Sequence, residues 1–206
     1  MGLTGLSVKE YVARVAAGTA APGGGSVCAL VCALSGALCL MTARLTLGRK
    51  KSSDAWSAME TLSRSMEPLV LRSMELAEQD AEAYERVLAA YKIAGGEERA
   101  RSIQAAMKQA AIVPMETLRV LAEITDLIEE VIEKGNPNCL CDTAMAVRMI
   151  RAAAGGAVDN VRANLAKIDD KNFVTHMQSE MTSLENNIEQ ATGRFGAFIE
   201  LLVSSS

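Results

Sequence analysis

Aromatic residues are scarce in this chain: they make up 3% of it, although hydrophobic residues together make up 50%. The apolar half is carried mainly by Ala, Leu, Val and Met, and strong helix formers dominate among them. Nowhere does the chain show the alternation of apolar and polar residues that a half-buried strand requires. Helical patterns without any strand alternation predict an all-α domain.

Positive charge is not in excess either. The formal net charge is −4, from 21 Lys and Arg against 25 Asp and Glu. Nucleic-acid binding depends on Lys and Arg side chains that neutralise phosphates, and no basic stripe interleaved with aromatic residues is present. We therefore expect no nucleic-acid partner.

Histidine occurs once, at His176, in a polar stretch far from the cysteines. The pairs Cys28 and Cys32, and Cys139 and Cys141, do not have the paired CxxC spacing of a zinc site, and a catalytic triad would have only His176 as its base. We expect no metal, and cysteines that act as small buried hydrophobes. The odd number of cysteines, and a first segment that does not resemble a signal peptide, predict a cytoplasmic protein.

Helical periodicity fills most of the chain. Ser7 and Glu10 form a capping box at the first helix, which Gly18 ends. Pro68 and Pro114 each interrupt a long pattern, so each predicts a kink or a break. We predict a single domain over residues 1–206, a bundle of long, partly kinked helices around a buried small-residue helix. The expected helices cover residues 8–17, 27–43, 53–94, 97–134, 143–154, 158–168 and 172–203.

The run from Val27 to Ala43 contains no charged residue. Its length is at the lower edge of what spans a bilayer. Small residues are spread through it, Arg44 closes it, and the other helices are amphipathic and able to cover it on all sides. We therefore predict a core helix and no membrane partner.

A glycine-rich loop, Gly23, Gly24 and Gly25, runs into this helix, with Ser26 as the expected N-cap. Three glycines in succession favour a tight turn or the close approach of another group. The free amides of a helix start suit an anion such as a carboxylate or phosphate. The Lys-Ser/Thr ending of a Walker loop is missing.

Other polar positions are open to two interpretations each. The basic cluster Arg49, Lys50 and Lys51 complements the negative end of the buried helix, or is simply a solvated last turn. Asp80 lies among apolar helical positions, yet an exposed acid would fit there too. Asn160 and Asn164 share one helical face, and a buried Asn needs hydrogen-bond partners.

The stretch Gly135–Asp142 separates two helices and brings Asn136, Asn138 and Asp142 into apolar surroundings. Desolvation raises the pKa of a carboxyl group toward neutrality, as a proton-transfer group requires. Asp142 is thus either an acid–base residue or a plain helix N-cap, and the residues alone leave both open.

Six segments follow one another along the chain: Ala21–Ser26, Leu45–Lys51, Asp80–Ala81, Val113–Pro114, Gly135–Asp142 and Asn160–Leu165. In this order they resemble the cyclodeaminase/cyclohydrolase family, over roughly residues 5–200. That family includes the C-terminal domain of formiminotransferase-cyclodeaminase and stand-alone bacterial methenyltetrahydrofolate cyclohydrolases. Where the family usually has Ser-Asp-Ala-Gly, this chain has Cys141, Asp142, Thr143 and Ala144.

The resemblance implies an all-α subunit, usually dimeric, that acts on one-carbon tetrahydrofolates and needs no cofactor. We expect a homodimeric enzyme that hydrolyses 5,10-methenyltetrahydrofolate to 10-formyltetrahydrofolate, because no formiminotransferase domain is attached here. A carboxylate would stabilise the amidinium-like cation and take a proton from the attacking water. Asp142 is the first candidate for this role and Asp80 the second.

The resemblance also suggests substrate contacts. Gly23, Gly24, Gly25 and Ser26, with Arg49, Lys50 and Lys51, would hold the anionic glutamate tail, and Asn136, Asn138, Asn160 and Asn164 would pair with the pterin. A shared site requires Asp142 to lie near the glycine loop. One alternative is a formiminotetrahydrofolate cyclodeaminase that releases ammonia. Another is a non-catalytic helical protein that binds folate or oligomerises.

Overall fold

The computed structural model describes residues 2–204, and the side chains of residues 2–199. Met1, Ser205 and Ser206, which belong to the predicted domain, lie outside this range. Over the described residues the chain is helical and has no strand, which confirms the predicted all-α class. The elements are η1 (Leu3–Gly5), α1 (Val8–Val15), α2 (Gly24–Leu47), η2 (Lys50–Ala55), α3 (Trp56–Lys92), α4 (Glu97–Lys134), η3 (Pro137–Cys139), α5 (Leu140–Leu165) and α6 (Lys171–Ser204).

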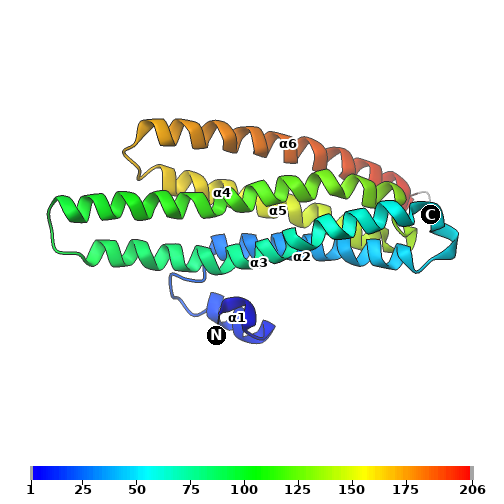
Figure 1. Ribbon diagram of the computed structural model, residues 1–206, viewed down its shortest axis with the longest axis horizontal. Helices are drawn as coiled ribbons and strands as arrows, with labels where there is room; N and C mark the ends of the chain where they lie inside the picture. The colour runs from blue at the N-terminus through cyan, green and yellow to red at the C-terminus, as the bar shows by residue number, and fades with distance from the viewer. Residues whose placement is uncertain (1, 205–206) are drawn as a thin grey trace.

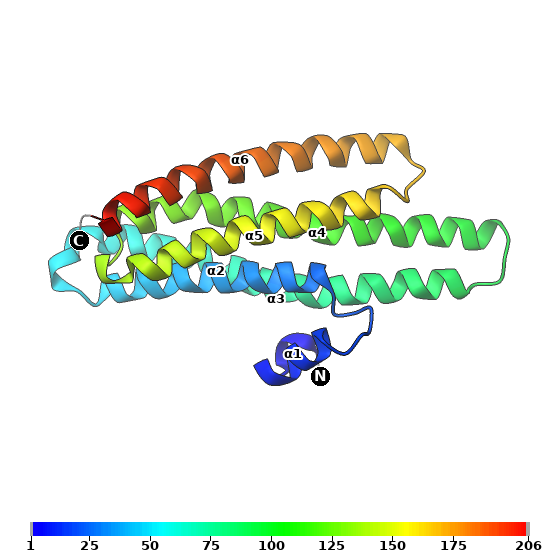
Figure 2. The ribbon, with the colours of Figure 1, turned by 180° about the vertical axis from the view of Figure 1, so that it is seen from behind.

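Four helices form the centre of the bundle. α3 and α4 make an antiparallel hairpin that runs the length of the molecule, and α2 and α5 pack against it (Figures 1 and 2). α6 covers α4 and α5 on the outer side, whereas α1 stands off the bundle. The short connections between long helices fix their antiparallel order.

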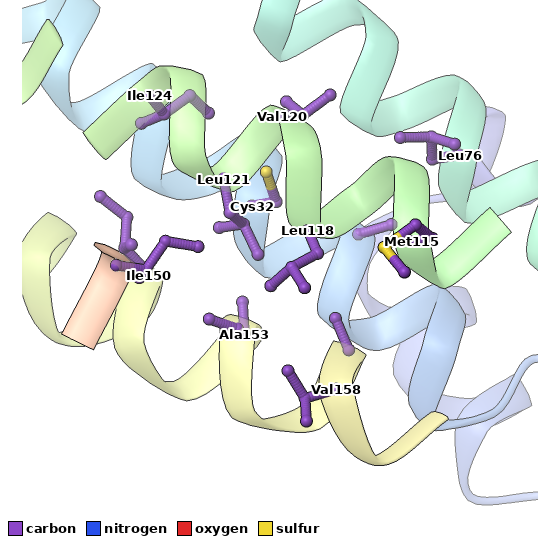
Figure 3. Close-up of a cluster of buried hydrophobic side chains, with 14 of the residues drawn as sticks. Cys32, Leu76, Met115, Leu118, Val120, Leu121, Ile124, Ile150, Ala153 and Val158 are labelled. Carbon is purple, nitrogen blue, oxygen red and sulfur yellow. The ribbon is translucent and has the colours of Figure 1, made fainter. Parts of the chain in front are cut away.

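The core is built from aliphatic side chains on facing helices (Figure 3). Leu118, Leu121 and Ile124 of α4 are fully buried. Opposite them lie Cys32 of α2 and Ile150 of α5, which are also fully buried. Deletion of one such Leu side chain to Ala would cost about 2–5 kcal/mol.

Residues expected to break helices lie inside continuous ones. Pro68 and Pro114 are interior residues of α3 and α4. α5 also runs through Gly155 and Gly156, where we expected one helix to end at residue 154 and the next to begin at residue 158. A Cβ atom at Gly156 would overlap with Cys28 Sγ, so this glycine allows α2 and α5 to approach closely.

The N-terminal arm is held to α3 by one carboxylate. Glu78 accepts hydrogen bonds from the backbone of Leu3 at 2.8 Å and of Thr4 at 2.6 Å. α1 then begins with the predicted capping box of Ser7 and Glu10. It ends at Val15, and Gly18 follows with a φ of 71°.

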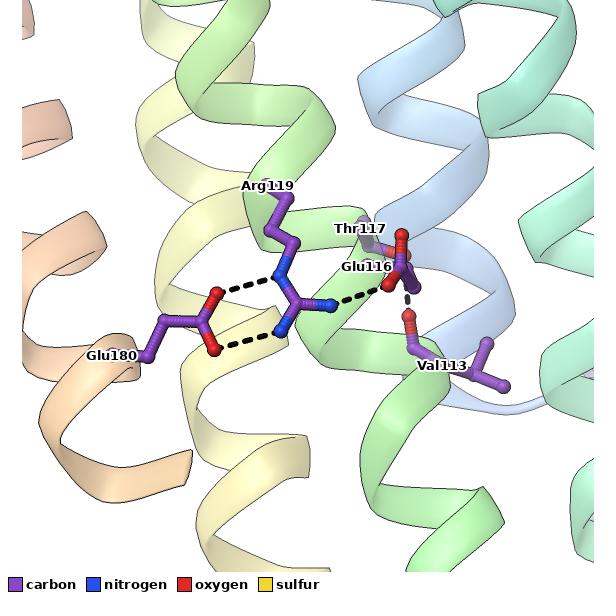
Figure 4. A network of polar contacts seen from close by, with 5 residues as sticks. All are labelled: Val113, Glu116, Thr117, Arg119 and Glu180. Carbon is purple, nitrogen blue, oxygen red and sulfur yellow. Dashed lines mark hydrogen bonds and ion pairs between the residues drawn. The ribbon is translucent and has the colours of Figure 1, made fainter. Parts of the chain in front are cut away.

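α6 is tied to the bundle by a charged contact. The Arg119 guanidinium of α4 donates to both carboxylate oxygens of Glu180, at 2.6 and 2.7 Å, and also pairs with Glu116 (Figure 4). The hydrogen bond from Arg119, with its positive charge, lowers the pKa of Glu180 against the effect of burial.

α2 is only partly the buried helix that we predicted. Its inner face carries fully buried Ala29, Cys32 and Cys39, but Leu34 and Leu45 on the opposite face are each 49% exposed. The expectation that other helices cover it on all sides is wrong. By length and composition alone α2 is long and apolar enough to cross a membrane, but 56% of its most apolar part is buried inside the bundle. The buried core helix of a soluble protein can have the same length and composition.

Candidate active site

The glycine loop forms the start of α2. Gly23 is the N-cap of this helix, so the prediction that Ser26 takes that position is wrong. Ser26 lies instead in the first turn, fully buried, and its hydroxyl donates to Asp80 Oδ2 at 3.0 Å. A Cβ atom at Gly25 would overlap with the Asp80 carboxylate, so the glycine is what lets this group reach the helix start.

Asp80 is therefore not the exposed acid that one interpretation of the sequence suggested. Burial raises the pKa of its carboxyl group, and the hydrogen bonds from Ser26 oppose that rise. The positive end of the α2 dipole lies beside it. A half-buried carboxyl group with a raised pKa has the properties of a general acid or base.

Asp80 lines a pocket of about 240 Å³ at this end of the bundle. α2, α3, α4 and α5 all contribute to the wall, which brings together residues that are far apart in sequence. Five predicted binding residues are among them, together with an apolar side formed by α3 and α4. The main lining residues are Gly23, Gly24, Gly25, Asp80, Ala83, Tyr84, Val87, Met107, Asn160, Asn164 and Lys167.

The two asparagines predicted on one face of a helix both line this pocket. Asn160 Nδ2 donates to the carbonyl of Gly156 at 2.7 Å, and Asn164 Nδ2 donates to the carbonyl of Ala110 at 2.8 Å. These bonds fix the orientation of both carboxamides. They use the Nδ2 atoms, so the Oδ1 atom of each asparagine can accept a hydrogen bond from a ligand. The sequence predicted that these two asparagines have hydrogen-bond partners, and two of those partners are backbone carbonyl groups.

One charged residue of the pocket was not predicted from the sequence. Lys167 lines the pocket and is the cation beside its polar groups. Positions 160, 164 and 167 are four and three residues apart, which is the spacing of residues on one face of a helix. That spacing is the only sequence signal that could have singled out Lys167 among the basic residues.

A second group of predicted residues lies at the other end of α2. It consists of Arg49, Lys50, Lys51, Asn136, Asn138 and Asp142. The Asn136 backbone N–H donates to Thr46 Oγ1 at 2.8 Å, and Asn136 Oδ1 accepts from the Asn138 backbone at 3.1 Å. Arg49 also donates to Asn136 Oδ1, at 2.5 Å. Asn136 is therefore a structural residue that joins the ends of α2 and α4, and Asn138 is exposed on the same turn.

Asp142 belongs to this second group. α5 begins at Leu140 with Cys139 as its N-cap, so Asp142 lies inside the first turn and is not the cap. It is partly exposed, and its charge adds to burial in raising the pKa of the Cys139 thiol. Lys50 and Lys51 are exposed on the neighbouring η2.

The departure from the family pattern around Asp142 has a packing explanation at one position. Thr143 is buried, lies 3.4 Å from the hydroxyl of Thr42 on α2, and donates to the Cys139 carbonyl at 3.1 Å. Cys141 is exposed, and nothing in the structure explains it.

The two groups lie at opposite ends of α2. A helix of 24 residues is about 36 Å long, and Figures 1 and 2 show its start near the end of α5 and its end near the start of α5. Within one subunit, Asp142 does not meet the Gly23–Ser26 loop, and this expectation is wrong. The predicted polar residues that do lie beside this loop are Asp80, Asn160 and Asn164.

Comparison with known proteins agrees with this architecture. The family model described as formiminotransferase-cyclodeaminase matches residues 7–183. The crystal structure of a formiminotetrahydrofolate cyclodeaminase from Thermotoga maritima superposes with a TM-score of 0.91 at 35% identity, covering 98% of this chain and 99% of that one.

Two relatives differ in length. The methenyltetrahydrofolate cyclohydrolase of Methylorubrum extorquens is 31% identical over 86% of this chain and 88% of its own length. The formimidoyltransferase-cyclodeaminase of Rattus norvegicus is 32% identical over 88% of this chain, which spans only 35% of the rat protein. Since the family model spans most of the chain and the crystal structure superposes over nearly all of it, the chain belongs to the formiminotransferase-cyclodeaminase family.

Proposed function

We propose that this chain hydrolyses 5,10-methenyltetrahydrofolate to 10-formyltetrahydrofolate in the pocket at the start of α2. The observation that carries the proposal is the Asp80 carboxyl group, half-buried, with a raised pKa and a hydrogen bond from Ser26. The sequence favours Asp142 as the first candidate, but of the two acids only Asp80 lines the pocket within one subunit. A relative that matches over most of its own length is named as a methenyltetrahydrofolate cyclohydrolase.

Asp80 would act on the attacking water. The ionised carboxylate stabilises the cationic N5–C–N10 bridge and takes a proton as the water oxygen bonds to the bridging carbon. The protonated carboxyl then gives that proton to N5 while the N5–C bond breaks. The second water proton leaves as the formyl group forms on N10, so one water is consumed and one proton is released.

The other pocket residues suit the parts of a folate. The free carboxamide oxygens of Asn160 and Asn164 would accept hydrogen bonds from a pterin edge. Ala83, Val87 and Met107 give an apolar wall for its ring. Lys167 and the amides at the start of α2 are candidates for anionic groups of the substrate.

Cyclodeamination is the second candidate, favoured by the similarity to the Thermotoga protein of that name. In that reaction N10 attacks the formimino carbon and ammonia leaves. Asp80 would carry a proton from N10 to the departing nitrogen. One carboxyl group in the same pocket can serve either chemistry.

The proposal includes no cofactor, because water and one acid–base group are sufficient for either reaction. It also includes a cytoplasmic location. All five cysteines are free thiols, as is usual in a reducing compartment.

Two assays test the proposal. Loss of the methenyl absorbance would report hydrolysis, and ammonia release from formiminotetrahydrofolate would report cyclodeamination. Asp80→Asn should lower the rate of the positive assay on the order of 100-fold or more, while folate binding persists. The control is Asp159→Asn, an exposed acid on α5. Full activity of Asp80→Asn would contradict the proposed role, and folate binding without turnover by the wild-type protein would indicate a binding module.

A further inference from the structure

The two asparagines of the pocket have a fixed hydrogen-bonding polarity. Asn160 Nδ2 donates to the carbonyl of Gly156. Asn164 Nδ2 donates to the carbonyl of Ala110. A backbone carbonyl accepts hydrogen bonds and cannot donate them, so neither carboxamide can turn over without the loss of its bond. The free atom of each carboxamide is therefore Oδ1, and the two asparagines offer a ligand two acceptors.

Lys167 adds a donor beside these acceptors. It lies just past the end of α5, and its backbone N–H donates to the Asn164 carbonyl at 3.1 Å, which continues the helical turn. Among the described side chains, those of residues 2–199, Lys167 forms no ion pair, whereas Lys108 and Lys134 each pair with an acid. A lysine ammonium group donates hydrogen bonds and accepts none. Along the chain, the pocket residues thus offer two acceptors followed by one donor.

The connection that carries Lys167 is held by one side chain of α4. Gln104 Nε2 donates to the Lys167 carbonyl at 3.1 Å, and Gln104 Oε1 accepts from the Asp169 backbone N–H at 2.9 Å. Ile168, between these two residues, is buried. Gln104 therefore uses both ends of its carboxamide to fix the backbone around Lys167, and the lysine side chain itself is left for the pocket.

This set of groups is complementary to one edge of a pterin. The edge carries a 2-amino group and an N3–H, which donate, and the O4 carbonyl, which accepts. The pocket volume of about 240 Å³ is below the roughly 300–1,000 Å³ of typical small-molecule sites, which suits the pterin end of a folate better than the whole molecule. The glutamate carboxylates are at the opposite end of a folate. The position of Lys167 next to Asn164 therefore favours O4 as its partner.

We infer that Lys167 is a specificity-determining residue that donates to O4 of the pterin and so selects 4-oxo over 4-amino pteridines, and that Gln104 positions it. The inference rests on the proposed function, because it takes the ligand of the pocket to be a folate. A 4-amino group would set a donor against the ammonium donor and leave both without a partner. Sites built around a hydrogen bond reject an analogue that cannot form it for this reason.

Two ligands that differ at one position test this assignment without turnover. Folic acid and its 4-amino analogue share the same glutamate tail, and titration calorimetry measures the affinity of each. The wild-type protein should bind folic acid on the order of 10-fold more tightly than the analogue. Lys167→Met should abolish this preference by weakening the binding of folic acid alone. Lys167→Glu replaces the donor with an acceptor and should reverse the preference.

The matched control is Lys171→Met, an exposed lysine on α6 that does not line the pocket. It should keep the wild-type preference. Equal weakening of both ligands in Lys167→Met would place the lysine at the glutamate tail that they share, and would overturn the inference. Equal affinity of the wild-type protein for the two ligands would overturn it as well.

A double-mutant cycle tests the positioning role of Gln104. Gln104→Ala should reduce the preference for folic acid in the wild-type background and should leave it unchanged in the Lys167→Met background, where no ammonium group remains to be positioned. Circular dichroism should show unchanged helical content. A preference that Gln104→Ala leaves intact, or changes equally in both backgrounds, would show that Gln104 does not act through Lys167.

Failure of the catalytic proposal is distinguishable from failure of this inference. A wild-type protein that prefers folic acid to its analogue but is inactive in both assays would contradict the proposed reaction and leave the role of Lys167 standing. A wild-type protein that is active but binds the two ligands equally would overturn the role of Lys167 and leave the reaction standing. Absence of any binding to either ligand would contradict both.

Discussion

The Asn164 side chain donates a 2.8 Å hydrogen bond to the carbonyl of Ala110 on the neighbouring helix. Ala110 is four residues before Pro114, which has no N–H to give to that carbonyl. Asn164 therefore supplies the donor that the proline removes. Two of the segments that suggested the family, around Pro114 and Asn164, are linked by this bond beside the pocket.

Asn164→Ala should lower the free energy of unfolding by about 1–3 kcal/mol, because it leaves the buried Ala110 carbonyl without a donor. In a Pro114→Ala background the residue at 114 regains its N–H, so the same substitution should cost about 1 kcal/mol less. Urea unfolding of the four proteins measures this coupling. Equal costs in both backgrounds would show that Pro114 and Asn164 act independently.

Ser26→Ala should move the acid limb of the pH–rate profile to higher pH. Burial raises the pKa of Asp80, and hydrogen bonds from the Ser26 hydroxyl and backbone lower it. The substitution removes the hydroxyl bond and keeps the backbone one, so the pKa rises further. The carboxylate that serves as base is then present only at higher pH. Ser35→Ala is the control, because Ser35 is also fully buried on α2 but donates to Cys32. A midpoint that stays in place would contradict the contact's effect on Asp80.

Gly155 and Gly156 should respond to alanine in opposite ways. Gly155 has open space around its Cα, so Gly155→Ala should stabilise α5 by up to about 1 kcal/mol through helix propensity. Gly156→Ala should destabilise the protein by about 1–3 kcal/mol, because the new methyl group meets Cys28 Sγ. Thermal unfolding measures both. Cys28→Ala should rescue Gly156→Ala, and a failure to rescue would indicate another cause.

Glu180→Gln should lower stability on the order of 1 kcal/mol at pH 7, because it weakens the bidentate contact with Arg119. The folded pKa of Glu180 is lowered, chiefly by that hydrogen bond. Its stabilisation is therefore present above the unfolded pKa and is lost as the pH falls through the folded value. The difference between variant and wild type should shrink in acid. Glu67→Gln, in an exposed pair with Arg44, should change stability much less.

The helices could be predicted from the sequence, because their hydrophobic periodicity and the Ser7 capping box are local signals. The continuity of three helices could not. Pro68, Pro114 and the glycine pair at 155–156 all favour breaks locally, and packing between helices overrides them. In one case the compensating group, Asn164, is 50 positions away from the proline.

The residue types of the site could also be predicted from the sequence, but which of these residues lie together in space could not. By itself the sequence determined an all-α bundle, the glycine loop at a helix start and the short list of acids and amides, since these depend on neighbours along the chain. Only the tertiary structure decided that Asp80, rather than Asp142, reaches the glycine loop. The reason is physical: α2 is a rigid rod about 36 Å long that holds its two ends apart, whereas close packing of α3 against Gly25 brings Asp80 to its start.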